Sequence, residues 1–150
     1  MEDLRELYQQ VILDHNKAPR NYGKLDSHTH YAEGDNPLCG DHIDLFIKVD
    51  KDNKISDIGF EGNGCAISKA SASLMTAELK GKSLEEAEQI FKLFHDMVTK
   101  DEVKPDFEKM GKLVALAGVK EFPIRVKCAS LAWHTLFEAM KETNRTASSE

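Results

Sequence analysis

The chain has few cysteines, no long apolar run and no cluster of basic residues, and each absence excludes a class of protein. Only three of the 150 residues are cysteine, and an odd number at wide spacing is not the disulfide framework of a small secreted protein. No apolar stretch approaches the length that spans a bilayer. The charged N-terminal residues 1–5 also lack the apolar run of a signal peptide. We therefore expect a cytoplasmic protein whose reduced thiols are free to bind metal or carry sulfur.

The charge pattern also narrows the range of partners. The net charge is −6 and no run is rich in Lys or Arg, so we expect neither nucleic acid nor membrane as a partner. The mildly acidic surface suits protein partners instead. The length predicts one domain over 1–150, and we expect the polar tail 143–150 to be frayed.

Apolar periodicity predicts an α+β fold in which strands precede most helices. Apolar residues at a spacing of 3.6 predict a first helix that ends near Asp14. Alternation over 43–49 and 55–61 predicts two strands joined by a tight turn, with a weaker strand over 27–33. Ile55 falls outside the alternation, which indicates a bulge or a frayed start. We expect a three-stranded antiparallel sheet with helices covering one face.

The remaining pattern, from Cys65 onward, is helical. One helix is predicted over 66–80, and a Ser83–Glu86 capping box opens another that runs to about 98. Asp106 is expected to cap a helix through about 116. Pro123 indicates a loop, after which Lys127 or Cys128 begins the last helix.

Two of the cysteines lie where the chain must turn. Cys39 stands between Pro37 and Gly40, and Asp41 follows two residues later. If the backbone is extended there, the thiol and the carboxylate point to the same side. Cys65 follows Gly-Asn-Gly and begins a helix, where unpaired N–H groups stabilise a thiolate. Both settings are typical of reactive thiols.

The third cysteine, Cys128, is predicted to begin a helix directly after two cations, Arg125 and Lys127. We expect these neighbours to lower the pKa of its thiol. Three thiolates and Asp41 carry a charge of −4, and Zn²⁺ or Fe²⁺ would leave −2 for the two cations to offset. A thiolate-rich site suits zinc or iron–sulfur chemistry.

The spacing of the cysteines does not itself show that they meet. Twenty-five residues separate Cys39 from Cys65, sixty-two separate Cys65 from Cys128, and there is no C-x2-C pair. Inert buried cysteines and a purely structural zinc site remain alternatives.

Four stretches nevertheless resemble a known family, the U-type iron–sulfur cluster assembly proteins, or SufU/IscU family. They are 8–15 with 19–23, Asn-Pro-Leu-Cys-Gly-Asp at 36–41, Gly-Asn-Gly-Cys-Ala-Ile-Ser at 62–68, and Arg-Val-Lys-Cys-Ala-Ser-Leu-Ala-Trp at 125–133. The stretches occur in order over nearly the whole chain. The resemblance implies the SufU/IscU fold and a shared metal site of Cys39, Asp41, Cys65 and Cys128.

Within the family the chain is more similar to SufU than to IscU. IscU-type proteins have His before the third cysteine, where this chain has Lys127. They also carry a Leu-Pro-Pro-Val-Lys stretch for a dedicated chaperone, and residues 121–125 read differently here. About twenty extra residues, near 98–113, lie between the second and third cysteines, as in SufU.

The SufU-like reading implies a zinc-dependent sulfurtransferase. Cys39 would accept persulfide sulfur from a PLP-dependent, SufS-like cysteine desulfurase and pass it to downstream iron–sulfur assembly proteins. Arg125 would support the site. The IscU-like alternative is a scaffold on which a [2Fe–2S] cluster is assembled and transferred, with Cys128 as the sulfur acceptor.

Overall fold

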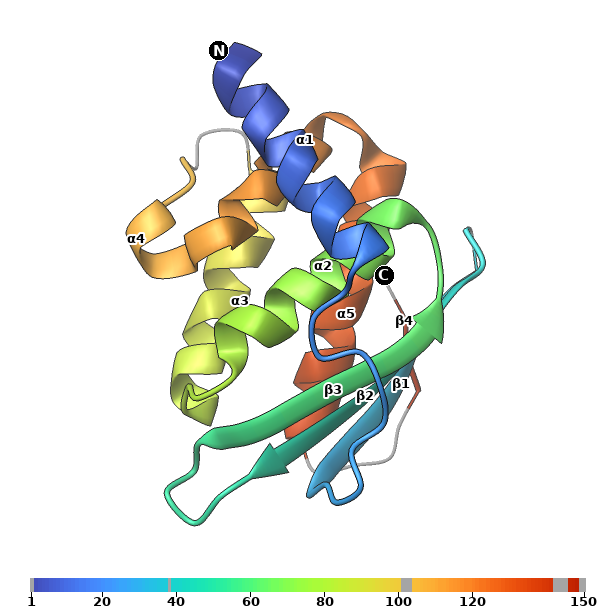
Figure 1. The fold of residues 1–150 in the computed structure, drawn as a ribbon, viewed down its shortest axis with the longest axis vertical. Coiled ribbons are helices and arrows are strands. Elements are labelled where there is room, and N and C mark those ends of the chain that lie inside the picture. The colour runs from blue at the N-terminus through green and yellow to red at the C-terminus, as the bar shows by residue number, and fades with distance from the viewer. Residues whose placement is uncertain (1, 38, 101–103, 142–145, 149–150) are drawn as a thin grey trace.

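The computed structural model describes residues 2–37, 39–100, 104–141 and 146–148. A sheet lies against a layer of helices (Figure 1). In chain order the elements are α1 (Glu2–Lys17), β1 (His30–Asn36), β2 (Asp41–Val49), β3 (Ile55–Asn63), α2 (Ala66–Leu79), α3 (Leu84–Thr99), α4 (Phe107–Met110), the 3₁₀ helix η1 (Gly111–Glu121), α5 (Pro123–Met140) and β4 (Thr146–Ser148). Across the described part of the chain, no helix is long and apolar enough to cross a membrane.

The predicted three-stranded antiparallel sheet is confirmed, with β2 between β1 and β3. The irregularity expected near Ile55 is also present, because Val49 pairs with Ile55 while Lys48 pairs with Asp57. The tail that we expected to be frayed contains a short strand. Its residues 146–148 form β4, which pairs in parallel with β1, and the rest of 143–150 lies outside the described residues.

Helix α5 packs on the sheet and brings the C-terminal third of the chain to strand β1. Gly34 makes this approach possible, since a Cβ atom there would lie 2.0 Å from Thr135 Oγ1. Leu45, Ile47 and Trp133 are fully buried in the core between the two layers. The packing therefore fixes α5 against the strands that lead to the cysteine loops.

Several helix boundaries differ from those predicted. Helix α5 begins at Pro123 and not at Lys127, because proline fits the first helical position, where no backbone N–H is needed. Asp106 does cap a helix through the Lys109 N–H, but α4 ends after one turn and the chain continues as η1. The Ser83–Glu86 capping box is confirmed.

The end of α1 is tied to α2 by polar contacts. His15, which is 3% exposed, has Nδ1 2.7 Å from Ser73 Oγ, and the backbone N–H of Arg20 donates to the same oxygen. Helix α1 extends to Lys17, beyond the predicted end near Asp14. These contacts hold α1 beside the end of the sheet where the cysteines lie.

Candidate metal centre

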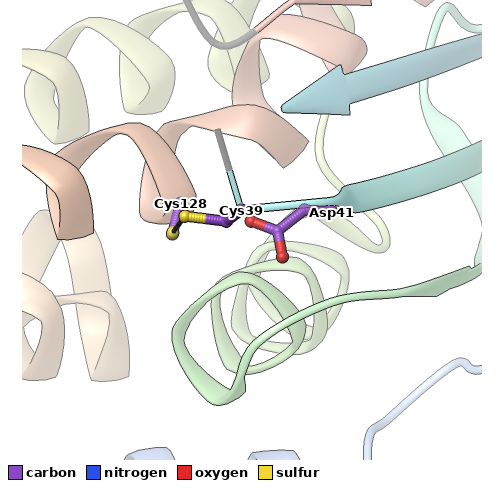
Figure 2. A group of neighbouring side chains, drawn as sticks. All are labelled: Cys39, Asp41 and Cys128. Carbon is purple, nitrogen blue, oxygen red and sulfur yellow. Dashed lines mark hydrogen bonds between the residues drawn. The ribbon is translucent and has the colours of Figure 1, made fainter. Parts of the chain in front are cut away.

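Three of the four predicted ligands converge at one end of the sheet. The ligand atoms of Cys39, Asp41 and Cys128 all lie within 4.8 Å of one another, and Figure 2 shows the three side chains side by side. Cys39 is exposed in the turn between β1 and β2, whereas Asp41 at the start of β2 and Cys128 in α5 are buried. The two thiols are in contact, with 3.4 Å between their Sγ atoms.

The fourth predicted ligand, Cys65, lies beside this group and not within it. Its backbone N–H donates to Asp41 Oδ1 over 2.8 Å. Its Sγ accepts from the Ser68 N–H at 3.4 Å and so caps helix α2. The side chain is close enough to Cys128 to affect the pKa of that thiol. Cys65 therefore begins a helix as predicted, and its thiol caps that helix.

Glycines let these segments meet. Gly40 has φ of +70°, in the left-handed region that favours glycine. A Cβ atom on Gly64 would lie 2.7 Å from Asp41 Oδ1. The Pro/Gly loop expected around Cys39 is therefore present, although Leu38 within it lies outside the described residues.

The expected lowering of the Cys128 pKa is wrong. Because α5 begins at Pro123, Cys128 lies in its second turn, away from the unpaired N–H groups, and is 3% exposed. Burial is the main reason that its pKa is raised well above its usual range, and contacts with Cys39 and Cys65 raise it further. A metal cation bound to this sulfur would favour its thiolate form.

Arg125 is exposed and lies over the ring of Phe122, with 4.5 Å from its Cζ to the ring centroid. Within the described part of the chain it makes no hydrogen bond or ion pair with Asp41. It does line the groove that leads to the cysteines. The arginine is therefore placed to meet a partner and not to neutralise the ligands directly.

Asn36 is a site residue to which the sequence assigned no role. It is 1% exposed at the end of β1. Its side-chain Nδ2 lies 3.4 Å from Asp41 Oδ2 and 3.8 Å from Cys128 Sγ, and it donates to both. The alternation along β1 could have pointed to Asn36, because this polar residue shares the buried face of the strand with Ala32 and Gly34.

A second group of possible metal ligands, Glu33, His42 and Asp44, lies on the other face of β1 and β2. The sequence predicts that His42 points away from Asp41, as observed. His42 contacts Asp35 at 2.8 Å and Asp44 at 3.3 Å, and the hydrogen bond to Asp35 is the main cause of its raised pKa. These ion pairs, and the hydrogen bonds that the Tyr31 hydroxyl donates to Glu33 and Asp44, account for this group.

A groove of about 1210 Å³ opens over the three cysteines. Its walls come from α1, the end of η1 and the start of α5, and they include Leu13, Phe122 and Ile124. These three apolar side chains are exposed, Ile124 by 63%. The site is therefore approached along a surface that is suited to contact with a protein.

The donor set fits a tetrahedral zinc ion. Zinc–sulfur bonds of about 2.3 Å place two sulfurs about 3.8 Å apart, and the Cys39 and Cys128 sulfurs are already 3.4 Å apart. A carboxylate oxygen and further sulfur are at hand in Asp41 and Cys65. Soft thiolates with one oxygen also suit iron in a sulfur cluster, so the donors alone do not select the metal.

Comparison with known proteins places this site in a family. Residues 7–143 match the NifU-like N-terminal domain. The chain belongs to this family. It is 46% identical over 143 residues to the iron–sulfur cluster assembly scaffold protein IscU of Streptococcus pyogenes serotype M1, covering 95% of this chain and 88% of that protein. It is also 46% identical over 134 residues to the zinc-dependent sulfurtransferase SufU of Bacillus subtilis, covering 89% of each.

The fold agrees with the sequence relationship. A crystal structure from Fervidobacterium islandicum AW-1, named as an iron–sulfur cluster assembly scaffold protein for the SUF system, matches with a TM-score of 0.80. It is 36% identical, and the match covers 87% of this chain and 94% of the other. The assignment to the SufU/IscU family of iron–sulfur cluster assembly proteins, and to its fold, is confirmed.

Proposed function

We propose that this protein is a zinc-dependent sulfurtransferase of iron–sulfur cluster assembly that works in the cytoplasm. Its sulfur donor is a PLP-dependent, SufS-like cysteine desulfurase carrying a persulfide. The observation that supports this most is the contrast in exposure among the ligands: Cys39 is exposed beside two buried ligands, Asp41 and Cys128. The zinc-dependent sulfurtransferase of Bacillus subtilis is a close relative.

Cys39, Asp41, Cys65 and Cys128 would hold the zinc, for which Cys65 gives up its cap on α2. When bound, the metal lowers the pKa of the thiols so that each ligand is a thiolate near neutral pH. Asp41 is kept in place by the Cys65 N–H. An oxygen ligand among sulfurs makes this centre less closed than a four-cysteine structural site.

The transfer step is a thiol–disulfide type of exchange. The Cys39 thiolate attacks the outer sulfur of the partner's persulfide, R–S–SH, and forms a new S–S bond. The S–S bond of the partner breaks, and its electron pair leaves on the partner's cysteine as a thiolate. The outer sulfur keeps its proton, so Cys39 ends as a persulfide with no net oxidation. Downstream iron–sulfur assembly proteins then receive this sulfur.

The groove gives the partner its path to Cys39. The exposed apolar residues Leu13 and Ile124 on its walls contact the desulfurase and exclude water from the exchange. Arg125 at the same surface is a cation available to an acidic group of the partner. This is the supporting role that we propose for it.

A scaffold for a [2Fe–2S] cluster is the second candidate, because the Streptococcus relative and the Fervidobacterium structure are both named as scaffolds. Cys128 would then accept the sulfur. Its burial, at 3% exposed, makes it less accessible to a partner's persulfide than Cys39. The exposure of Cys39 therefore favours the transferase.

Metal content and persulfide mapping test the two candidates together. The zinc-loaded protein is incubated with a cysteine desulfurase and cysteine, trapped with a thiol reagent and mapped by mass spectrometry. We expect one zinc per chain, an added sulfur on Cys39 and desulfurase turnover at least about tenfold above that with Cys39→Ala. Lys51→Ala, in the turn between β2 and β3, should behave like the wild type. Sulfur on Cys128, or a cluster in the absorbance spectrum, would support the scaffold instead.

A further inference from the structure

We propose that Asn36 is a positioning residue that clamps Asp41 and Cys128 as the two fixed ligands of the metal centre. This inference rests on the proposed zinc site. It assigns to one amide the task of joining ligands that come from different parts of the fold. Asn36 lies at the end of β1 directly opposite Asp41 in the register with β2, and α5 brings Cys128 to the same point.

The contacts are made by one nitrogen atom. Nδ2 of Asn36 donates to Asp41 Oδ2 and to Cys128 Sγ, at 3.4 and 3.8 Å. Cys128 is 92 positions along the chain from Asn36. Both acceptors are anionic when they bind metal, and a hydrogen bond to a charged acceptor is stronger than one between neutral groups. The amide therefore favours the forms of these side chains that coordinate a cation.

The orientation of the amide supports a role at the ligands. Its other atom, Oδ1, is buried and has no hydrogen-bond partner among the described residues. An unsatisfied buried acceptor is unfavourable, yet turning the amide over would aim Oδ1 at a carboxylate and a sulfur. The side chain thus adopts the orientation that serves the two ligands and leaves its own oxygen unpaired.

The clamp divides the ligands into fixed and departing ones. Asp41 is held at both oxygens, by Asn36 on Oδ2 and by the Cys65 N–H on Oδ1. Cys39 is not held by this amide. It lies in the turn that follows Asn36, where its backbone N–H donates to the Asn36 carbonyl at 3.2 Å. Asn36 keeps the buried part of the site assembled while the exposed thiol exchanges.

The test compares two substitutions with a matched control. Asn36→Asp keeps the shape but replaces the donor with an anion, and Asn36→Ala removes the amide. Asn16→Asp, near the end of α1, makes the same change of charge away from the site. Zinc affinity is measured by competition with a chelator, and the ligand field is read from the absorption spectrum of the Co²⁺-substituted protein. Thermal unfolding of the metal-free protein is followed in parallel.

We expect both Asn36 variants to bind zinc about 10- to 100-fold more weakly, the usual cost of losing a residue that orients a ligand. Their Co²⁺ spectra should shift, while Asn16→Asp matches the wild type. Wild-type zinc affinity and Co²⁺ spectra in both variants would overturn the clamp, even if their metal-free forms unfold at lower temperature. Failure of the wild type itself to bind zinc would instead overturn the proposed function.

Discussion

The candidate ligands owe their positions to small and polar residues with no metal chemistry of their own. Gly64 gives Asp41 room beside the start of α2. Ser71, fully buried, donates its hydroxyl to the Ala129 carbonyl at 2.6 Å and so ties α2 to α5 beside Cys128. Each of these residues can be changed without removing a ligand atom.

Gly64→Ala is expected to weaken zinc binding about tenfold or more, as loss of ligand orientation does in other sites. The added Cβ would lie 2.7 Å from Asp41 Oδ1, so the carboxylate must move away from the Cys65 N–H. Chelator competition measures the effect. Gly118→Ala is the control, since its Cβ would have no heavy atom within 4 Å. Equal zinc affinities in the two variants would contradict this account of Gly64.

His15 makes stability depend on pH. Burial, with a smaller effect of Arg20, lowers its pKa in the folded protein, whereas the unfolded chain takes up a proton near pH 6.5. The contribution of His15 is therefore present above about pH 6.5 and is lost as the pH falls below it. Urea unfolding of the metal-free protein from pH 7.5 to 5.5 should show a shallower pH dependence for His15→Gln than for wild type. If the free energy of unfolding varied with pH equally in His15→Gln and in wild type, His15 would not be the source of the pH dependence.

At the residue scale, the sequence singled out the candidate ligands but not the groups that surround them. Cys39, Asp41 and Cys128 could be singled out from neighbouring Pro, Gly and basic residues. The raised pKa of Cys128 could not be predicted, because it depends on burial by segments distant in sequence. The role of Asn36 likewise depends on a contact with a helix that begins 87 positions later, at Pro123.

At the scale of elements, local sequence patterns predicted the three-stranded antiparallel sheet and the starts of the capped helices. They did not predict the elements whose structure depends on tertiary contacts. Alternation located β2 and β3, and Ser83 marked the start of α3. The helix predicted from Asp106 to about 116 is one turn of α4 followed by the 3₁₀ helix η1. Strand β4 is stabilised by pairing with β1, which a short polar sequence does not show.

The stability of the fold should be sensitive to added side-chain volume where β1 packs against α5. Gly34→Ala would place a Cβ atom against Thr135 Oγ1 and within 3.1 Å of side-chain atoms of Ile43 and Leu131. We expect a loss of roughly 1–3 kcal/mol in the free energy of unfolding, the usual cost of overpacking. Urea unfolding measures this loss. When Thr135→Ala is added to Gly34→Ala, the hydroxyl is removed and part of the stability should return. Adding Thr135→Ser instead keeps the hydroxyl and should return none. Equal stability of the two double variants would contradict the contact.

At the scale of the whole molecule, the candidate metal centre brings together the β1–β2 turn and the second turn of α5, with the start of α2 beside them. The spacing of the cysteines did not predict that these segments meet. That prediction came from the family resemblance alone. Their meeting depends on the sheet register and on the placement of α5. A metal ion bound there would therefore act on the stability of the entire fold.

Removal of metal should lower the thermal midpoint of the whole chain. A ligand that binds only the folded state at 100 times its dissociation constant adds about 2.7 kcal/mol to stability. Calorimetry with zinc and with excess chelator measures the shift, which should appear in one cooperative transition. Asp41→Ala should show a much smaller shift. An equal zinc-induced shift in that variant would place the ion elsewhere.

The contact between the Cys39 and Cys128 sulfurs, 3.4 Å apart, has a consequence for handling the protein. Without metal, the two thiols lie within reach of a direct covalent bond. Oxygen or an oxidised glutathione would take up the two electrons and two protons that are released as the bond forms. The resulting disulfide would remove both the proposed sulfur acceptor, Cys39, and a proposed metal ligand, Cys128. Bound zinc would therefore also protect the two thiols from oxidation, and the metal-free protein is best kept under reducing conditions.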